Sequence, residues 1–451
     1  MKNDVGVIGL SVMGRNLVYN LLDHHYLVAG YNRSSEVTKQ LNEENHSLFH
    51  GFEDIDEFLK SLSKPRKIIL LIKEGSATQS VVNLLLDKLE EGDILIDCGN
   101  AHYQDSISRS HDALKKGVFY YSAGISGGAK GARYGASIMP SGNVEQYVHI
   151  QSILEDISAK KDHKPCCIYL GESGAGHFVK MIHNAIEYAV MQLLAEVYIV
   201  LNPFYTQMEI SDIFAQWNKE HPSYLLEITS EIFKSNFESK PILELIEDVS
   251  GHKKTGMWAS MYALEHGLDA SLLISAFQAR ATSSHLVERA YYHQEVNSSS
   301  VIDLDSLHQA YLLMQNLSYI QGFNLIKDAS VRYGWQLNLQ DVAFIWQAGC
   351  IIQGEVLTIL LQAMVKEEKD ELLLSSWMKR NIEEKKHGLS KVVEQMVIDQ
   401  YPCPCFINGL TYINQLQSSL LGANLIQAQR DYFGQHGIKF KGKDTVIHYE
   451  W

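Results

Sequence analysis

VGVIGLSVMGRN, residues 5–16, joins a short run of β-branched residues directly to two spaced glycines. Residues 5–8 predict a buried strand, and Gly9 permits the tight turn that follows it. Ser11 is a small residue where the dinucleotide-binding pattern G-x-G-x-x-G has its middle glycine, and Gly14 lets a helix pack closely on the strand. An ordinary strand–turn–helix, which needs only one glycine, is the alternative. The place of the pattern directly after a first strand and before a helix favours a dinucleotide site. We expect the following helix to direct its N-terminus at a pyrophosphate.

On the C-terminal side of this stretch, short apolar runs alternate with helical patterns as far as about residue 170. Strands are expected at 5–8, 26–31, 67–72, 93–97 and 117–122, and a helix is expected at 75–89. Such alternation predicts a parallel, doubly wound sheet. Beyond about residue 173, helical periodicity dominates and strand signals nearly vanish. The sequence therefore predicts an α/β Rossmann-type domain at 1–175, a large all-α domain at 176–433 and a C-terminal tail at 434–451.

The helical part carries a faint internal repeat. DIFAQW at 212–217 is echoed by DVAFIW at 341–346, and a long, mostly apolar helical segment precedes each copy. A duplicated helical unit would explain the echo, and chance similarity is the alternative. The tail at 434–451 is rich in Gly and Lys and has no helical period. We expect this tail to dock on another surface or to remain disordered.

The composition excludes several classes of protein. The chain has 451 residues, of which 46% are hydrophobic and 20% charged, and its net charge of −14 argues against a nucleic-acid surface or a polybasic membrane anchor. Met1–Gly9 is predicted to be a strand rather than a signal peptide, and no apolar run approaches the about 20 residues of a spanning helix. Six Cys include no C-x-x-C, and the 19 His form no metal-binding pair. We expect a cytoplasmic protein without metal.

The end of the second predicted strand indicates which dinucleotide binds. A site for NAD usually has Asp or Glu here, bonded to the ribose 2′-hydroxyl. This chain has Asn32-Arg33-Ser34 instead. A guanidinium pairs with a 2′-phosphate that a carboxylate would repel, so we expect NADP rather than NAD. A solvated surface arginine is the alternative.

A stripe of polar residues marks the first long helix of the second part. Lys180, His183, Asn184, Glu187 and Tyr188 follow the spacing of one helical face, and apolar residues flank that face on both sides. Buried Lys and Glu are costly unless they are paired or functional, so we expect the stripe to line a cavity. A solvated polar face is the alternative, and it fits the apolar flanks poorly.

Lys180 and Glu187 suit acid–base chemistry. Seven residues separate them, which is about 10 Å along a helix axis. Their side chains can therefore converge on opposite sides of a small substrate. One group would remove a hydroxyl proton and the other would deliver a proton to carbon.

With these motifs together, the chain resembles decarboxylating 6-phosphogluconate dehydrogenases of the β-hydroxyacid dehydrogenase superfamily over nearly its whole length. The resemblance rests on several motifs in the right order: residues 9–16, 32–34, Asp97-Cys98-Gly99-Asn100, Ser126-Gly127-Gly128, 137–140, 174–188 and NLIQAQRDYFG at 424–434. It implies NADP-dependent oxidation and decarboxylation of 6-phosphogluconate to ribulose 5-phosphate and CO2 by a homodimer. Neither nucleic acid nor membrane is an expected partner.

The resemblance also implies roles for individual residues. Lys180 would be the general base and Glu187 the general acid. The residues expected to contact NADP are Gly9, Leu10, Ser11, Val12, Met13, Gly14, Asn32, Arg33, Ser34, Ile72, Lys73, Glu74 and Asn100. The residues expected to bind substrate are Asn100, Ser126, Gly127, Gly128, His183, Asn184, Tyr188, Lys253 and Arg280, with Arg430 and His436 donated by the partner subunit.

The chain departs from the family pattern at positions that carry no assigned chemistry: Cys98, Ala129, Lys130, Ala185, Val190, Lys254 and Met257. These departures leave two alternatives open. The first is a dehydrogenase for another β-hydroxyacid, against which the phosphate-side residues Lys253, Arg280, Arg430 and His436 argue. The second is a non-catalytic sensor of 6-phosphogluconate or NADP, against which the retained pair of Lys180 and Glu187 argues.

Overall fold

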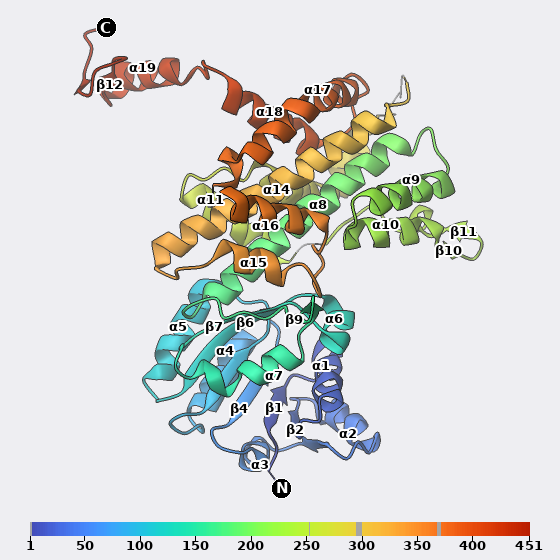
Figure 1. Cartoon of the computed structure of the whole chain (residues 1–451), viewed down its shortest axis with the longest axis vertical. Coiled ribbons are helices and arrows are strands. Elements are labelled where there is room, and N and C mark those ends of the chain that lie inside the picture. The colour runs from blue at the N-terminus through green and yellow to red at the C-terminus, as the bar shows by residue number, and fades with distance from the viewer. Residues whose placement is uncertain (1, 252, 295–299, 368–370) are drawn as a thin grey trace.

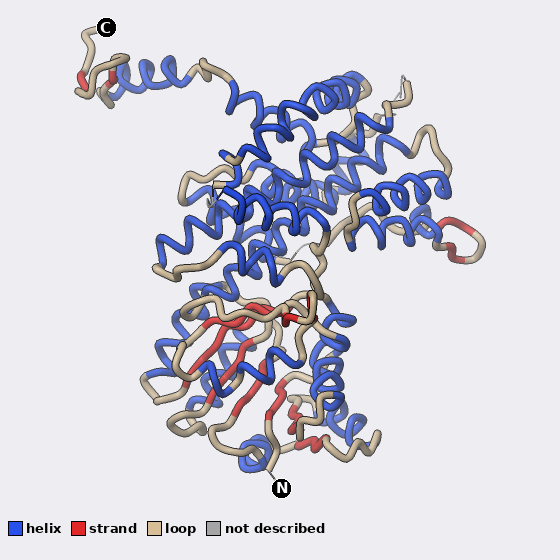
Figure 2. The backbone as a smooth tube through the Cα atoms, viewed as in Figure 1, coloured by secondary structure: helices blue, strands red, loops and turns tan. Residues whose placement is uncertain are grey.

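The computed structural model describes residues 2–251, 253–294, 300–367 and 371–451 (Figure 1). An α/β domain holds the N-terminal part of the chain, a larger helical domain lies on one side of it, and an arm that carries the C-terminus projects from the helical domain. Strands are concentrated in the α/β domain (Figure 2). The predicted fold class, a Rossmann-type domain followed by a large helical domain, is confirmed.

The main sheet has the strand order β3-β2-β1-β4-β5-β6-β7, in which all neighbours are parallel except β6 and β7. Its strands are β1 (Val5–Ile8), β2 (Val28–Tyr31), β3 (Phe49–Phe52), β4 (Lys67–Leu70), β5 (Ile94–Asp97), β6 (Phe119–Ile125) and β7 (Ile138–Ser141). The strand order reverses between β1 and β4, and ligands of such sheets bind at the carboxyl ends of the strands beside this switch point.

Two strands of the main sheet, β3 and β7, were missed by the sequence prediction. β3 contains Gly51, and β7 contains Pro140, and these two residue types weaken a strand signal. β7 is an edge strand, where proline is tolerated because one side of the strand needs no ladder hydrogen bonds.

Helices cover both faces of the sheet, and successive residues of its strands enter two separate cores. In β4, Ile69 packs into the core that contains Val5 and Ile96, whereas Ile68 and Leu70 pack into the opposite core. The helices of this domain are α1 (Val12–Asp23), α2 (Ser35–Glu43), α3 (Ile55–Ser61), α4 (Ser76–Leu86), α5 (Tyr103–Leu114), α6 (Gly128–Tyr134) and α7 (Gln151–Asp156), followed by the hairpin β8 (Lys160–Lys161) and β9 (Lys164–Pro165).

Two long helices, α8 and α14, lie side by side at the centre of the helical domain. The helices of this domain and of the arm are α8 (Ala175–Leu201), α9 (Gln207–Glu220), α10 (Tyr224–Lys234), α11 (Lys254–Glu265), α12 (Ser271–Ser283), α13 (Leu286–Tyr291), α14 (Leu304–Tyr333), α15 (Leu339–Ile345), α16 (Glu355–Glu367), α17 (Ser376–Ile398), α18 (Pro404–Gln417) and α19 (Ala423–Gly434). A short hairpin, β10 (Asn236–Phe237) with β11 (Lys240–Pro241), follows α10.

Helix α8 corrects one expectation from the sequence. Among the described residues it is the one helix that is long and apolar enough to cross a membrane by length and composition, with a mean hydropathy of 1.3 in its most apolar window. The prediction that no apolar run approaches spanning length is therefore wrong by this criterion. Inside the protein, 67% of that window is buried, as in the core helix of a globular domain.

The helical domain is built from two units with the same packing. In the first unit (α8–α12), α8 packs on α11 and α12, α9 on α10, and α11 on α12. In the second unit (α14–α18), α14 packs on α17 and α18, α15 on α16, and α17 on α18. The two copies of the sequence echo lie in α9 and at α15, which are equivalent helices. The equal packing favours duplication over chance as the source of the echo.

The C-terminal tail has more local order than the sequence indicates. Strands β12 (Ile438–Lys439) and β13 (Val446–Ile447) form a hairpin. The Asp431 carboxylate on α19 accepts hydrogen bonds from the Gly437 and Tyr449 amides at 2.8 and 3.0 Å and from the Trp451 indole at 3.1 Å. The buried carboxylate therefore folds the tail back onto α19. These hydrogen bonds lower the pKa of Asp431 well below its usual range.

Candidate functional site

The glycine loop lies at the switch point of the sheet, between β1 and α1. Gly9 has a φ of 98°, and a Cβ on it would lie 2.4 Å from the Leu71 carbonyl oxygen, at the end of β4. A Cβ on Gly14 would lie 1.8 Å from the Gly9 carbonyl oxygen. Only glycine therefore allows this close approach of α1 to β1. Ser11 and Val12 are exposed at the N-terminus of α1, where backbone amides are available to a phosphate.

Asn32 binds the glycine loop rather than projecting freely from it. Its Oδ1 accepts a hydrogen bond from the Leu10 amide at 3.0 Å, and its Nδ2 donates to the Ser34 carbonyl at 3.1 Å. The neighbouring Arg33 is exposed and makes no hydrogen bond or ion pair with any residue that the structure describes. The β2 end therefore offers one free guanidinium beside the loop, as a 2′-phosphate site requires.

The other residues expected at the cofactor follow the neighbouring strands. Ile72, Lys73 and Glu74 come after β4, and Asn100 comes after β5. A Cβ on Gly99 would lie 3.0 Å from the Ile72 carbonyl oxygen, so these two loops are in contact. The structure therefore brings together the predicted elements of the dinucleotide site at one edge of the sheet.

A buried network around Asp97 fixes the start of the loop that carries Asn100. The Asp97 carboxylate accepts hydrogen bonds from Tyr120 Oη at 2.6 Å and from the Gly99 amide at 3.0 Å, and Arg109 lies 3.4 Å from it. The Asp97 carbonyl oxygen lies 3.0 Å from Nε2 of His177 on α8. The network therefore ties the cofactor side of the α/β domain to the first turn of α8.

Helix α8 crosses the sheet at the point where Lys180 is placed. A Cβ on Gly124 of β6 would lie 2.4 Å from Cβ of Lys180, so β6 and α8 are in direct contact. The Lys180 side chain is 7% exposed. Burial lowers the pKa of Lys180 to about 8, although Glu187 opposes this effect. The neutral amine that a general base requires is therefore far more populated near neutral pH than in an ordinary lysine.

His183 links Lys180 to the end of β6. Its Nδ1 lies 3.4 Å from Lys180 Nζ and 3.1 Å from Asn184 Oδ1, and its Nε2 lies 2.9 Å from Ser126 Oγ. Burial and the neighbouring ammonium of Lys180 hold the pKa of His183 well below its ordinary value. The imidazole is therefore neutral, with both ring nitrogens close to polar partners.

Glu187 faces the same space from the next turn of α8. Its Oε2 lies 3.8 Å from His183 Nδ1. Burial raises the pKa of Glu187, while Lys180, Arg280 and Lys253 act in the opposite direction. The protonated form of the carboxyl is therefore favoured by its surroundings. A base with a lowered pKa and a group with a raised pKa therefore lie 3.4 and 3.8 Å from the same nitrogen of His183, as acid–base catalysis on one small substrate needs.

Two further cations lie beside Glu187. The Arg280 guanidinium lies 3.5 Å from the centroid of the Tyr188 ring, and the Tyr188 hydroxyl accepts a hydrogen bond from the Lys253 amide at 2.8 Å. Tyr188 therefore positions both α12, which carries Arg280, and the start of α11 at Lys253. This end of the site is cationic and suits an anionic group of a ligand.

Sequence reasoning missed the segment that closes the site, residues 346–350. The Trp346 ring lies 5.6 Å from the His183 ring, and a Cβ on Gly127 would lie 2.4 Å from the Gly349 carbonyl oxygen. Cys350 is buried close enough to Lys180 for each to affect the other's pKa. The sequence echo at 341–346 ends where this segment begins, but the echo does not indicate that the segment lies beside His183.

Arg430 and His436 are the two predicted substrate residues that the structure does not bring to this site. Both are exposed on the C-terminal arm, where Arg430 Nη1 donates to Gln427 Oε1 at 3.1 Å. Figure 1 shows α19 at the end of this arm, away from α8. Four large side chains of α19 are also exposed: Leu425, Ile426, Tyr432 and Phe433. In a single chain the predicted substrate site therefore lacks these two residues. Among the described residues, no group of three His, Cys, Asp or Glu could hold a metal ion.

Comparisons with known proteins cover the chain from end to end. Residues 4–171 match the family model described as the NAD binding domain of 6-phosphogluconate dehydrogenase, and residues 176–451 match that of the 6-phosphogluconate dehydrogenase C-terminal domain. The chain is 39% identical over 475 residues to 6-phosphogluconate dehydrogenase, decarboxylating 1, of Saccharomyces cerevisiae, covering 100% of this chain and 97% of that protein. It is 40% identical over 465 residues to the NADP(+)-dependent, decarboxylating 6-phosphogluconate dehydrogenase of Bacillus subtilis, covering 100% and 99%.

Solved structures agree with these matches. The 6-phosphogluconate dehydrogenase of Plasmodium falciparum, studied in its apo form, with its cofactor NADP+ and with its substrate 6-phosphogluconate, superposes with a TM-score of 0.94 at 35% identity. The match covers 99% of this chain and 100% of that one.

Proposed function

The chain belongs to the 6-phosphogluconate dehydrogenase family, and we propose that it converts 6-phospho-D-gluconate and NADP to D-ribulose 5-phosphate, CO2 and NADPH. One observation carries the proposal: the buried amine of Lys180 and the partly buried carboxyl of Glu187 lie 3.4 and 3.8 Å from the same nitrogen of His183, and their pKa values are shifted in opposite directions. A protein that only binds its ligand has no need for such a pair.

In the proposed reaction, bound NADP accepts a hydride from C3 of the substrate. Neutral Lys180 takes the proton of the C3 hydroxyl, which leaves a 3-keto acid. Protonated Lys180 then donates a hydrogen bond to the C3 carbonyl oxygen and stabilises the enolate that forms as CO2 leaves. Glu187 protonates the carbon that lost the carboxylate. The β-keto group takes up the electron pair of the broken bond, so the chemistry does not require a metal.

The remaining residues of the site would bind and orient the two ligands. We assign the carboxylate end of the substrate to Ser126, Gly127 and Gly128, the hydroxyls to Asn100, His183 and Asn184, and the phosphate to Tyr188, Lys253 and Arg280. The glycine loop would hold the pyrophosphate of NADP and Arg33 the 2′-phosphate. Asn32 would contribute by holding the loop through the Leu10 amide.

We further propose that the active unit is a homodimer in which Arg430 and His436 enter the partner's site. The projecting arm, the exposed apolar side chains of α19, and the position of α19, which carries Arg430, away from α8 in Figure 1 support this arrangement. The arm would bury its apolar face and complete the phosphate end of the partner's site in the same step. We place the domain boundaries near residues 175 and 433 and the enzyme in the cytoplasm.

A panel of substrates tests the proposed activity. Purified enzyme is assayed for NADPH formation with 6-phosphogluconate, unphosphorylated gluconate and 3-hydroxyisobutyrate, each with NADP and with NAD. We expect kcat/KM to be highest for 6-phosphogluconate with NADP. A preference for an unphosphorylated acid would assign the chain a different substrate, and no turnover of any acid would favour a binding role.

A further inference from the structure

The two units of the helical domain are related by a local two-fold arrangement. Ser223, directly before α10, pairs with Gly354, directly before α16, in an antiparallel bridge. The first residue of each helix donates a hydrogen bond to the other unit: the Tyr224 amide to the Gln353 carbonyl at 3.1 Å, and the Glu355 amide to the Pro222 carbonyl at 2.7 Å. Such reciprocal contacts are what a two-fold relation produces.

The tryptophans that end the two sequence echoes pack in the same reciprocal way. Trp346 of the second unit lies against His183 on α8 of the first, with ring centroids 5.6 Å apart. Trp217 of the first unit stacks on His308 of α14 in the second, at 4.4 Å. Because Trp346 packs on His183 as Trp217 packs on His308, His183 corresponds to His308 and Glu187, four residues further on, corresponds to Leu312. The second unit therefore has a place equivalent to the catalytic face of α8.

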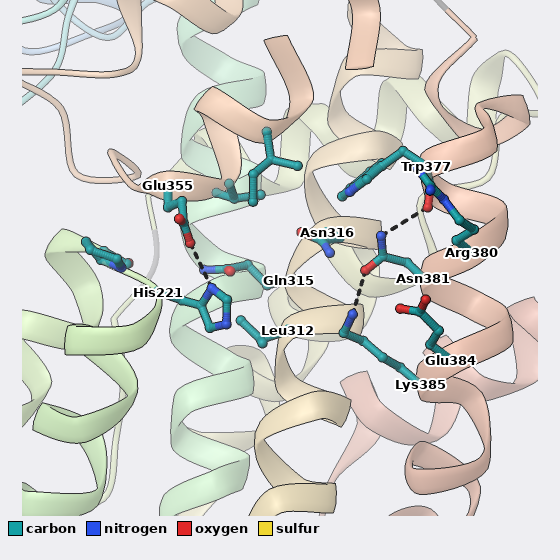
Figure 3. A pocket seen from close by; sticks show the side chains of 14 residues that line it. His221, Leu312, Gln315, Asn316, Glu355, Trp377, Arg380, Asn381, Glu384 and Lys385 are labelled. Carbon is teal, nitrogen blue, oxygen red and sulfur yellow. Dashed lines mark hydrogen bonds and ion pairs between the residues drawn. The ribbon is translucent and has the colours of Figure 1, made fainter. Parts of the chain in front are cut away.

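A cavity of about 280 Å³ occupies this equivalent place (Figure 3). Leu312 and Asn316 of α14 line it, and residues of α16, α17 and the segment before α10 form its other walls. Its size is at the lower end of the roughly 300–1,000 Å³ of small-molecule sites. We propose that this cavity binds a neutral, hydroxyl-rich molecule of monosaccharide size, and that it is a second ligand site, separate from the one around Lys180.

Two mostly buried amide side chains, those of Asn316 and Gln315, lie at the cavity and suit a polar ligand. The Asn316 side chain is 7% exposed and makes no hydrogen bond with any residue that the structure describes. The neighbouring Gln315 is 4% exposed, and its amide donates to Tyr311 Oη at 3.1 Å. The Asn316 amide faces the cavity and is not one of the fully enclosed polar atoms that lack a partner, so a ligand in the cavity can form hydrogen bonds with it.

The charges around the cavity indicate the class of ligand. Arg380 and Lys385 are matched by Glu384 and Glu355. Glu355 Oε2 lies 2.7 Å from His221 Nδ1, and Lys385 donates to Asn381 Oδ1 at 2.9 Å. Because cations and carboxylates balance, the cavity does not favour an anion, unlike the site beside Lys253 and Arg280. Hydroxyl groups both donate and accept, so a polyol can satisfy amides, carboxylates and cations together.

The remaining walls of the cavity are apolar. The Trp377 indole lies on one side of it (Figure 3), and Val356 and Ile359 of α16 also line it. Aromatic and aliphatic walls suit the C–H faces of a sugar, while the amides and charged groups suit its hydroxyls. This combination of a few polar groups with apolar walls is typical of small-molecule sites.

Binding to the full-length protein tests the proposal. D-glucitol and D-glucose are titrated as neutral probes, and D-gluconate and inorganic phosphate as anionic ones, by ligand-observed NMR. We expect saturable binding of a neutral probe that weakens at least about tenfold in Asn316→Leu and is unchanged in Glu187→Gln. No saturable binding of either neutral probe would overturn the proposal. So would tighter binding of an anion that weakens in Asn316→Leu, which would place the anion in this cavity, or loss of neutral-probe binding in Glu187→Gln, which would place that probe in the catalytic site.

Two further measurements separate a ligand role of Asn316 from a structural one. Without ligand, Asn316→Leu should raise the melting temperature, because it removes a buried amide that has no partner. It should also leave NADPH formation unchanged, since Asn316 lies outside the catalytic site. A lower melting temperature would mean that the amide stabilises the fold, and would contradict the proposal even if binding were lost.

Discussion

Replacing Lys180 with Met should make the protein more stable while abolishing its activity. Met has a side chain of similar length without the charge, so it fits in the buried position that Lys180 occupies. The pKa of Lys180 falls from its ordinary 10.5 to about 8 on burial. At about 1.4 kcal/mol for each pKa unit, the charged amine destabilises the folded state by about 3 kcal/mol. This figure already includes the attraction between Lys180 and Glu187, because that attraction is one of the causes that set the pKa of Lys180.

The sign of the pH dependence follows from the lowered pKa. Below pH 8 the amine is charged in both the folded and the unfolded chain, so the full cost of burying the charge is present. Between about pH 8 and 10.5 the unfolded chain binds the extra proton, and stability rises with pH. Above pH 10.5 the cost is absent. The advantage of Lys180→Met should therefore be largest below pH 8 and disappear toward pH 10.5.

Thermal unfolding over a series of pH values measures this difference. The matched control is Lys219→Met on α9, an exposed lysine whose replacement should change the melting temperature little at any pH. Activity is followed in parallel and should be lost only in Lys180→Met. A melting temperature at pH 7 that is equal to or below that of the wild type would refute the reasoning, as would an advantage that stays constant up to pH 10.

Replacing Arg33 with Ala should lower kcat/KM for NADP by about tenfold or more and leave NAD little affected, because a guanidinium forms charge-assisted bonds with the 2′-phosphate alone; equal losses for both cofactors would remove the assigned role. Replacing Glu187 with Gln should lower turnover about 10²–10⁴-fold, as for other general acids. The pH profile of kcat/KM should be bell-shaped in the wild type, and Glu187→Gln should leave a single rise from Lys180 with a pKa below 8, because the Glu187 charge that raises the pKa of the amine is gone; a flat profile in the variant would contradict the assigned base. Mixing a Lys180→Ala chain with an Arg430→Ala chain, each nearly inactive alone, should restore up to about half of the activity per mixed dimer, since one site then carries both defects and the other neither; no recovery despite proven subunit exchange would place Arg430 in its own chain's site.

The parts of the fold that the sequence predicted are those in which local pattern and packing agree. Val5–Ile8 is β-branched and followed by Gly9, so both its strand and its turn could be read directly. The polar stripe of α8 could be predicted because apolar residues flank it on both sides, and the folded chain places Lys180 and Glu187 close to the same His183 nitrogen. β7 could not be predicted in this way, because Pro140 conceals an edge strand.

Contacts between distant segments were beyond local reasoning. Nothing in the residues around Ser126 indicates that its hydroxyl lies 2.9 Å from His183 Nε2, or that Trp346 packs on the same imidazole. The amide of Asn32 looked available to a cofactor, yet it binds the Leu10 amide across the loop. The order of the tail likewise depends on one carboxylate, that of Asp431. Nothing in the sequence indicates which groups this carboxylate binds.

The coupling of oxidation to decarboxylation is the central claim, and one isotopic measurement tests it directly. The enzyme is incubated with NADP and 6-phosphogluconate that carries ¹³C at C1, and NADPH and labelled CO2 are quantified together. The account predicts one labelled CO2 for each NADPH, unlabelled ribulose 5-phosphate as the other product, and neither product with Lys180→Met. NADPH formation that leaves the label in an organic acid would contradict it, because the chain would then oxidise its substrate without decarboxylating it.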